Sequence, residues 1–198
     1  MKLISWNVRQ LKIPGKGRLI RNMLQQEKLH VLFLQDTKCN STTLEHILTK
    51  AWPGSKEVVV EAIGTSGGLA IVWDERAIKH TNIHASKHFI QAMFHITGTN
   101  VHGHLTNVYF PQDAINKVDI LNTLTQINSE RSLSLWITGG DFNMITKMEE
   151  KGGGQAKLDI ERTHFKNYIQ NNRLIDMEFN NGIYTWNNKC TNAHQIAS

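Results

Sequence analysis

Short apolar runs, separated by segments with helical periodicity, are the feature that most constrains the fold of this 198-residue chain. The runs have the length of strands and end at glycines or polar residues, which predicts strands at residues 2–8, 30–35, 57–63, 68–73, 77–84, 88–96, 103–110, 133–138 and 182–187. Elsewhere apolar residues recur every three or four positions, which predicts helices at residues 17–29, 42–50, 114–128 and 157–171. We expect Ser41 or Thr42 to cap the second of these helices. The succession predicts a mixed α/β fold in which two stacked sheets carry helices on the outside.

Length and composition predict a single domain over residues 1–198. The chain is 40% hydrophobic, which is enough for a sizeable core, and it has no apolar run of 18 residues that could span a membrane. Its first residues, MKLISWNVRQ, lack the apolar segment of a signal peptide, so we expect an intracellular protein with no membrane partner. Cys39 and Cys190 have no zinc-finger spacing and are expected to be reduced thiols. We expect a monomer.

Positive charge is concentrated near the N-terminus. The formal net charge is +5, and the first 28 residues contain one acidic residue, Glu27, against the cations Lys2, Arg9, Lys12, Lys16, Arg18, Arg21 and Lys28. One interpretation is a solvated helix face followed by a basic loop. The other is a rim that contacts phosphates. The sequence leaves both open.

Polar residues with useful chemistry lie at or just after the ends of several predicted strands: Asn7, Asp36, Tyr109, Asp141 and Asn143. Functional residues gather on loops at strand ends because a rigid sheet positions them. Asn7 and Asp36 offer hard oxygen ligands of the kind that Mg²⁺ prefers, and a magnesium ion with few protein ligands keeps positions open for a phosphate. These residues therefore predict a metal-assisted reaction at phosphorus.

The remaining three residues suit the other parts of such a reaction. Asp141 can accept a proton from water, Asn143 can hold the same water, and Tyr109 can donate a hydrogen bond to developing charge. Four of the five residues also have a purely structural alternative: an Asx turn for Asp141, a helix cap for Asp36, a bond to buried backbone for Asn7, and core packing for Tyr109. Their joint occurrence favours a site.

Four motifs in this order, SWNVR (5–9), LQDTK (34–38), NVYFP (107–111) and GGDFN (139–143), resemble those of the endonuclease/exonuclease/phosphatase superfamily. A narrower resemblance is to the endonuclease domain of LINE-type retrotransposons, particularly those of plants. It is carried by SGGLAIVW (66–73), NNRLIDM (171–177) and GIYTWNN (182–188). The resemblance implies a four-layered α/β sandwich and a Mg²⁺-dependent phosphodiesterase that nicks DNA, with Mn²⁺ as the alternative metal.

The resemblance also implies roles for individual residues. Asn7 and Asp36 correspond to metal ligands, and Tyr109 corresponds to the tyrosine that contacts the phosphate. Asp141 corresponds to the residue that activates water, with Asn143 as its orienting partner. Because they sit beside motif residues, Arg9 and Lys38 are expected to contact the DNA backbone.

Two departures from the family pattern affect the expected activity. Position 36 is Asp where the family has Glu, so the side chain is one methylene shorter. The family continues beyond its YTW motif into strands that end in a Ser-Asp-His motif. This chain ends at Ser198, and His194 follows Asn-Ala rather than Ser-Asp. We take the histidines at positions 80, 84, 88, 102 and 104 as surface residues.

The sequence thus predicts a C-terminally truncated phosphodiesterase domain that lacks its last strands, acts on DNA in the nucleus, and has reduced or lost activity. Two alternatives remain. The first is a non-catalytic remnant that binds DNA, and the second is a phosphatase that acts on small phosphate esters.

Overall fold

The computed structural model describes residues 1–129, 134–147 and 159–177. The chain divides into two compact units, one formed by Met1–Phe110 with Leu133–Phe142 and the other by Pro111–Ser132 with Asn143–Ser198. The single-domain expectation stays a prediction. The expected strand at 182–187, the GIYTWNN motif, Cys190 and His194 lie outside the described residues. In the part of the chain that is described, no helix has the length and apolar character needed to cross a membrane.

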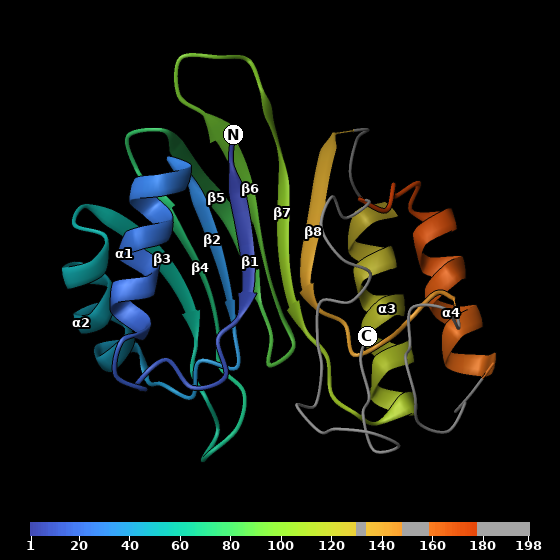
Figure 1. The fold of residues 1–198 in the computed structure, drawn as a ribbon. Helices are drawn as coiled ribbons and strands as arrows, with labels where there is room; N and C mark the ends of the chain where they lie inside the picture. The colour runs from blue at the N-terminus through green and yellow to red at the C-terminus, as the bar shows by residue number, and fades with distance from the viewer. Residues whose placement is uncertain (130–133, 148–158, 178–198) are drawn as a thin grey trace. The chain divides into compact units, whose positions relative to one another are not determined.

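The first unit contains two mixed four-stranded sheets (Figure 1). The first sheet has the order β1-β2-β4-β3, formed by β1 (Leu3–Asn7), β2 (Val31–Gln35), β4 (Leu69–Asp74) and β3 (Ser55–Val60). The second has the order β5-β6-β7-β8, formed by β5 (Ile78–Ala85), β6 (Phe89–Ile96), β7 (His102–Tyr109) and β8 (Leu135–Asp141). The pairs β1–β2 and β7–β8 are parallel and the other pairs are antiparallel.

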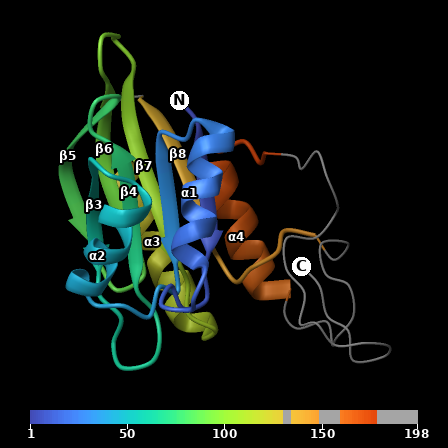
Figure 2. The ribbon, with the colours of Figure 1, turned by 60° about the vertical axis from the view of Figure 1, so that its left-hand side comes forward.

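Strand β2 shows why these residues form a buried sheet. Its five residues, VLFLQ, are all buried, as expected for a strand covered on both faces. Phe33 packs in the cluster between the two sheets, with Phe94 and Leu105 from the second sheet. Leu34 packs on the opposite face, in the cluster that holds Ile20 of helix α1 (Lys16–Glu27) and the apolar side of α2 (Ser41–Ala51). The two helices lie on the side of the first sheet that faces away from the second (Figures 1 and 2).

The second unit contains α3 (Ala114–Ser129) and α4 (Asp159–Asn171). A buried ion pair joins them, with Lys117 Nζ 3.0 Å from Glu161 Oε2. Just past the end of α4, Asn172 Nδ2 donates to Thr125 Oγ1 on α3 at 3.0 Å. These bonds hold the two helices against each other.

The predicted fold class is confirmed: the protein is α/β, with two stacked mixed sheets and helices. Every predicted helix and strand within the described residues is present, with shifted ends. The cap prediction was wrong, because the N-cap of α2 is Asn40, whose side chain accepts a hydrogen bond from Thr43 N at 3.0 Å. Strand 133–138 was predicted too short, since β8 continues through Gly139 and Gly140 to Asp141.

The expectation of surface histidines holds for His84 and His102, which are exposed, and His88 and His104 are partly exposed. It was wrong for His80, because both of its ring nitrogens are buried. His80 points between the sheets because it pairs with Phe94, and its ring centroid lies 4.3 Å from that of Trp73. Burial lowers the pKa of His80 to about 4, so its ring is neutral near pH 7.

A buried amide links the two sheets. Asn107 of β7 is fully buried, and its Nδ2 donates to Leu34 O at 3.1 Å and to Ala70 O at 2.9 Å, which both belong to the first sheet. Its Oδ1 accepts from Gln35 Nε2 at 2.6 Å, and Gln35 Nε2 also reaches Ser5 Oγ at 3.1 Å. Apolar contacts alone allow sheets to slide, whereas directional hydrogen bonds fix where β7 lies across β2.

Replacing Asn107 with Leu should destabilise the protein strongly. The substitution removes the Asn107 amide from two buried carbonyls and removes one of the two acceptors of Gln35 Nε2, and each such loss costs about 1–3 kcal/mol. We expect urea denaturation to show a free energy of unfolding lower by about 3 kcal/mol. The exposed Asn22 on α1 gives the control, because Asn22→Ala should change it by less than about 0.5 kcal/mol. Equal effects of the two substitutions would contradict the assigned role.

Candidate functional site

Four strand ends meet at one edge of the first unit. Parallel pairing brings Asn7 opposite Gln35 in the first sheet and Tyr109 opposite Asp141 in the second. The loops continue this pairing, since Gln10 N donates to Asp36 O at 2.7 Å and Phe110 N donates to Asp141 O at 2.9 Å. The polar residues at the strand ends are therefore neighbours within each sheet.

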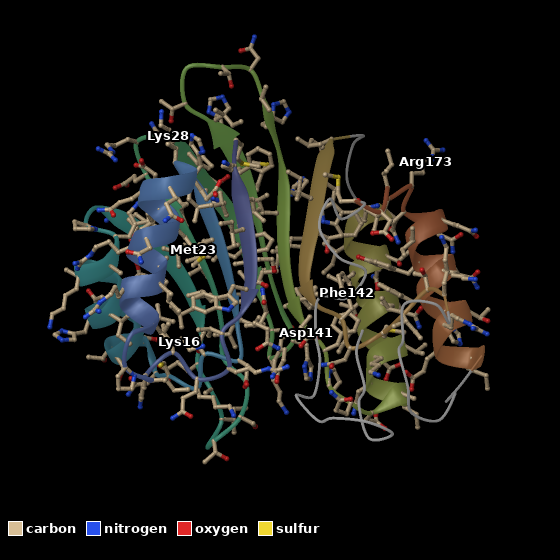
Figure 3. The ribbon with its side chains drawn as sticks, viewed as in Figure 1. Lys16, Met23, Lys28, Asp141, Phe142 and Arg173 are labelled. Atoms are coloured by element: carbon tan, nitrogen blue, oxygen red, sulfur yellow. The ribbon has the colours of Figure 1, made fainter. Side chains whose placement is uncertain are left out.

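Two side-chain interactions join the strand ends of different sheets. Asn7 Nδ2 donates to Asp141 Oδ2 at 2.6 Å, and Asn7 Oδ1 accepts from the backbone N–H of Arg9 at 3.3 Å. The carboxylate of Asp36 lies close enough to the Tyr109 side chain to raise the pKa of the tyrosine. The structure thus brings Asn7, Asp36, Tyr109 and Asp141 into one cluster, which we call the strand-end site; Figure 3 labels Asp141 at the end of β8.

The electrostatics of the strand-end site keep Tyr109 protonated. Burial raises the pKa of Tyr109 to about 12, helped by the charges of Asp36 and Asp141 and by the hydrogen bond to Asp36, while Arg9 opposes the rise. At neutral pH the tyrosine is therefore a hydrogen-bond donor and not a base. This protonation state is the one that its predicted role requires.

Asp36 is held in an uncommon conformation. Its residue is 7% exposed, its φ is 52°, and its Oδ2 lies 3.6 Å from Lys38 Nζ. Among the described residues, eight non-glycine positions have positive φ, and five of them are predicted site residues or flank one in the sequence: Arg9, Gln10, Asp36, Lys38 and Asn143. Such backbone strain persists where the surrounding structure enforces it, and it concentrates at functional sites.

The loop that carries Asp36 is braced by Gly67 and Gly68. Thr37 N donates to Gly68 O at 3.2 Å, and Lys38 N donates to Gly67 O at 3.0 Å. A Cβ at Gly68 would lie 2.3 Å from Thr37 Oγ1, so no larger residue fits beside this loop. The SGGLAIVW segment therefore supports the position of Asp36 from the side of β4.

Asn143 belongs to the second unit. Its Oδ1 accepts from Gln112 Nε2 at 2.9 Å, and its backbone carbonyl accepts from Lys117 Nζ at 2.8 Å. Its expected place beside a water held by Asp141 stays a prediction. Sequence reasoning missed Gln112 and Lys117, because nothing in the pattern of α3 marks a lysine for burial.

The oxygen donors at the strand-end site suit a hard cation. Among the described residues, no group of three or more His, Cys, Asp or Glu side chains could hold a metal ion. Asp36 and the Oδ1 of Asn7 offer two oxygen ligands, and a Mg²⁺ ion commonly takes one or two carboxylates and completes its shell with water and substrate. The donor set therefore fits Mg²⁺ or Mn²⁺ better than a closed structural metal site.

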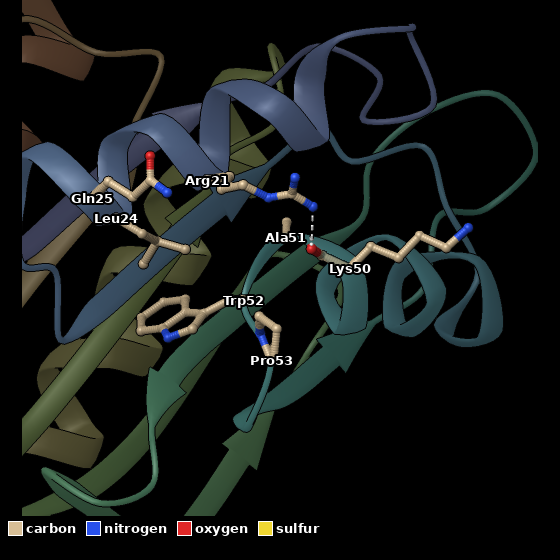
Figure 4. A pocket seen from close by; sticks show the side chains of 7 residues that line it. All are labelled: Arg21, Leu24, Gln25, Lys50, Ala51, Trp52 and Pro53. Carbon is tan, nitrogen blue, oxygen red and sulfur yellow. Dashed lines mark hydrogen bonds between the residues drawn. The ribbon is translucent and has the colours of Figure 1, made fainter.

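A cavity of about 440 Å³ lies away from the strand ends, between α1 and the end of α2 (Figure 4). It is lined by Arg21, Leu24, Gln25, Lys50, Ala51, Trp52 and Pro53. Arg21 Nη2 donates to Lys50 O at 2.6 Å and so binds the last turn of α2. No carboxylate lines this cavity, and none of its lining residues belongs to the strand-end site.

The two glycines before Asp141 serve different purposes. Gly140 has φ 136°, and a Cβ there would lie 2.1 Å from Val108 O, so glycine is required for β8 to pair with β7 at this point. Gly139 could carry a side chain, since a Cβ there would lie 3.7 Å from the Phe33 ring, an ordinary van der Waals contact. The pair lets β8 run straight on to place Asp141 opposite Tyr109, instead of turning away before it.

The fold matches those of solved structures of known proteins. No protein-family model matches the sequence, and no curated protein matches it. The 3′ phosphatase NExo from Neisseria, bound to a product DNA hairpin, has TM-score 0.66 and 19% identity over 86% of this chain and 71% of that chain. An AP endonuclease from Archaeoglobus fulgidus has TM-score 0.67 and 17% identity over 86% of this chain and 70% of that chain.

An endonuclease/exonuclease/phosphatase family protein from Bacteroides thetaiotaomicron has TM-score 0.57 and 16% identity over 71% of this chain and 62% of that chain. At these identities the likeness establishes the fold. The chain therefore has the α/β fold of endonuclease/exonuclease/phosphatase proteins, as the four motifs implied.

Adjacent alanine substitutions test the glycine assignment. Gly140→Ala should lower the free energy of unfolding by more than about 1 kcal/mol, because both the backbone conformation and the contact with Val108 exclude a Cβ. Gly139→Ala, one residue earlier, should be close to neutral. Thermal denaturation of the two variants gives the comparison, and a Gly140→Ala variant as stable as Gly139→Ala would show that the assignment is wrong.

Proposed function

We propose that this chain is a Mg²⁺-dependent phosphodiesterase that nicks DNA. The observation that carries the proposal is the hydrogen bond from Asn7 to Asp141, which joins the two sheets where Tyr109 also meets Asp36. A hydrogen-bonded carboxylate, a protonated tyrosine and two hard oxygen ligands in one place suit hydrolysis of a phosphate ester. The fold supports the proposal, because it is shared with an AP endonuclease and with a phosphatase bound to DNA.

Each residue of the strand-end site has a defined task in this proposal. Asn7 and Asp36 hold a Mg²⁺ or Mn²⁺ ion, which supplies positive charge beside the scissile phosphate. Asp141 accepts a proton from the attacking water, and the Asn7 amide fixes the orientation of its carboxylate. Tyr109 donates its hydroxyl proton in a hydrogen bond to a phosphate oxygen as negative charge develops. Asn143 orients the same water.

DNA is the proposed substrate because cations surround the strand-end site. Arg9 and Lys38 sit on the loops that follow β1 and β2, and Lys16 lies over the Trp6 ring at 4.9 Å with its Nζ donating to Val8 O. A polyanion satisfies several such cations at once, whereas a small phosphate ester satisfies few. Motifs 66–73 and 171–177 support a LINE-type endonuclease, which would act in the nucleus.

Substituting Asp141 tests the catalytic proposal. In a plasmid-nicking assay with Mg²⁺, Asp141→Asn should lower the rate by about 100-fold or more, because the variant cannot accept the proton of water. The exposed Asp119 on α3 supplies the matched control, and Asp119→Asn should leave the rate unchanged. Wild-type protein without Mg²⁺-dependent nicking, or an Asp141→Asn variant that nicks normally, would contradict the proposal. In the first case, binding without cleavage would favour the non-catalytic alternative, and phosphate release from small esters would favour the phosphatase.

The salt dependence of DNA binding tests the role of Arg9. The logarithm of affinity for a short duplex should fall linearly with the logarithm of salt concentration, because phosphate contacts release counterions. Arg9→Gln should reduce the steepness of that slope by about 1, and Lys79→Gln on the exposed face of β5 should not. Fluorescence anisotropy at several salt concentrations measures both slopes. Identical slopes for Arg9→Gln and wild type would exclude a phosphate contact at this residue.

A further inference from the structure

The hairpin between β6 and β7 places two exposed histidines directly opposite each other. His95 and His102 are cross-strand partners in the antiparallel ladder, and both are exposed. Backbone hydrogen bonds show which cross-strand pairs are hydrogen-bonded. Ile96 N donates to Val101 O at 2.9 Å and Tyr109 N donates to His88 O at 2.9 Å, so 96–101 and 88–109 are hydrogen-bonded pairs. Hydrogen-bonded pairs alternate along such a ladder, so 95–102 is a non-hydrogen-bonded pair, the kind with the closer side chains.

The two imidazoles therefore leave the same face of the sheet at short range. Cα atoms of a non-hydrogen-bonded pair lie about 4.5 Å apart. At that separation one ion can be reached by a ring nitrogen from each histidine, because metal–nitrogen bonds are about 2.0–2.1 Å long. Two ligands on adjacent strands of a rigid sheet bind with little loss of conformational freedom, which favours chelation.

The hydrogen bonds of His102 fix which nitrogen faces outward. His102 Nδ1 lies 3.1 Å from the Asn100 carbonyl oxygen, which can only accept a hydrogen bond. In the neutral ring Nδ1 therefore carries the proton, and Nε2 keeps its lone pair. A carbonyl that holds the non-ligating nitrogen in this way is the usual support for a metal-binding histidine.

We propose that His95 and His102 form a binding site for one late first-row transition-metal ion, Zn²⁺ or Cu²⁺. Imidazole ligands suit these ions and not Mg²⁺. In the described part of the chain no third His, Cys, Asp or Glu completes a larger group, so water fills the remaining positions. The exposed Lys79 pairs with His95 from β5, and its charge weakens the binding. The site is therefore of moderate affinity.

This site is independent of the strand-end site. His102 begins β7 and Tyr109 ends it, so the two sites lie at opposite ends of one strand, as Figure 1 shows for the β6–β7 hairpin and the end of β7. Seven residues of strand span about 23 Å. Occupancy of the hairpin site does not require that the protein cleave DNA.

Metal titrations of histidine variants test the proposal. Wild-type protein, His95→Gln, His102→Gln and the double variant are titrated with Zn²⁺ by calorimetry at pH 7.4. Each single variant should bind one Zn²⁺ ion fewer than wild type, or bind that ion at least about tenfold more weakly, because one of its two protein ligands is removed. The double variant should resemble the single variants, because either substitution already destroys the chelate.

The exposed His84 on β5 provides the matched control, and His84→Gln should bind as many Zn²⁺ ions as wild type, with the same affinity. Electron paramagnetic resonance of the Cu²⁺ form should show two ring nitrogens at the ion and only one in His95→Gln. Thermal denaturation verifies that the variants fold. Unchanged Zn²⁺ binding in both single variants, a loss in His84→Gln as large as theirs, or a wild-type spectrum with a single nitrogen would overturn the proposal.

Discussion

The Asn107 side chain is the interaction on which the arrangement of the first unit depends. It satisfies two carbonyls of the first sheet and the amide of Gln35 from a strand of the second sheet. A shift of β7 would leave the Asn107 amide buried without hydrogen bonds, which would destabilise the fold. The bonds therefore fix the position of β7 over β2 and β4. Because Asn107 lies two residues before Tyr109, and Gln35 directly before Asp36, that placement also brings the side chains of Tyr109 and Asp36 close together.

The strand-end site concentrates charge that needs compensation. Burial raises the pKa of Tyr109, and the nearby charges of Asp36 and Asp141 raise it further. Lys38 near Asp36 and Arg9 near Tyr109 provide part of the balancing charge. A divalent cation between the carboxylates and an incoming phosphate would provide more, so the electrostatics and the ligand chemistry favour the same occupant. The strained conformations of Asp36 and Lys38 are consistent with a loop that is shaped for this purpose.

Local patterns carried most of the fold prediction. Apolar runs and helical periodicity located the described strands and helices, and the order of polar residues at strand ends was enough to indicate Asn7, Asp36, Tyr109 and Asp141. Apart from the cap of α2, which is a local feature, the errors arose where a residue distant in the sequence decides the outcome. Gly139 and Gly140 resemble a turn, but pairing with β7 keeps them in a strand. Asn107 resembles another strand-end polar residue, but it is fully buried and bonds across the core. Packing against Trp73 partly buries His80, and an ion pair with Glu161 accompanies the burial of Lys117; no local sequence pattern predicts either.

The convergence of the strand ends on a single cation can be measured directly with Mn²⁺, whose unpaired electrons broaden nearby amide signals in nuclear magnetic resonance. Trace Mn²⁺ should broaden the amides of Asn7, Asp36, Tyr109 and Asp141 together, although these residues are far apart in the chain. Mg²⁺ in excess should restore them. Broadening confined to one strand end, or located elsewhere while these four signals stay sharp, would contradict the account.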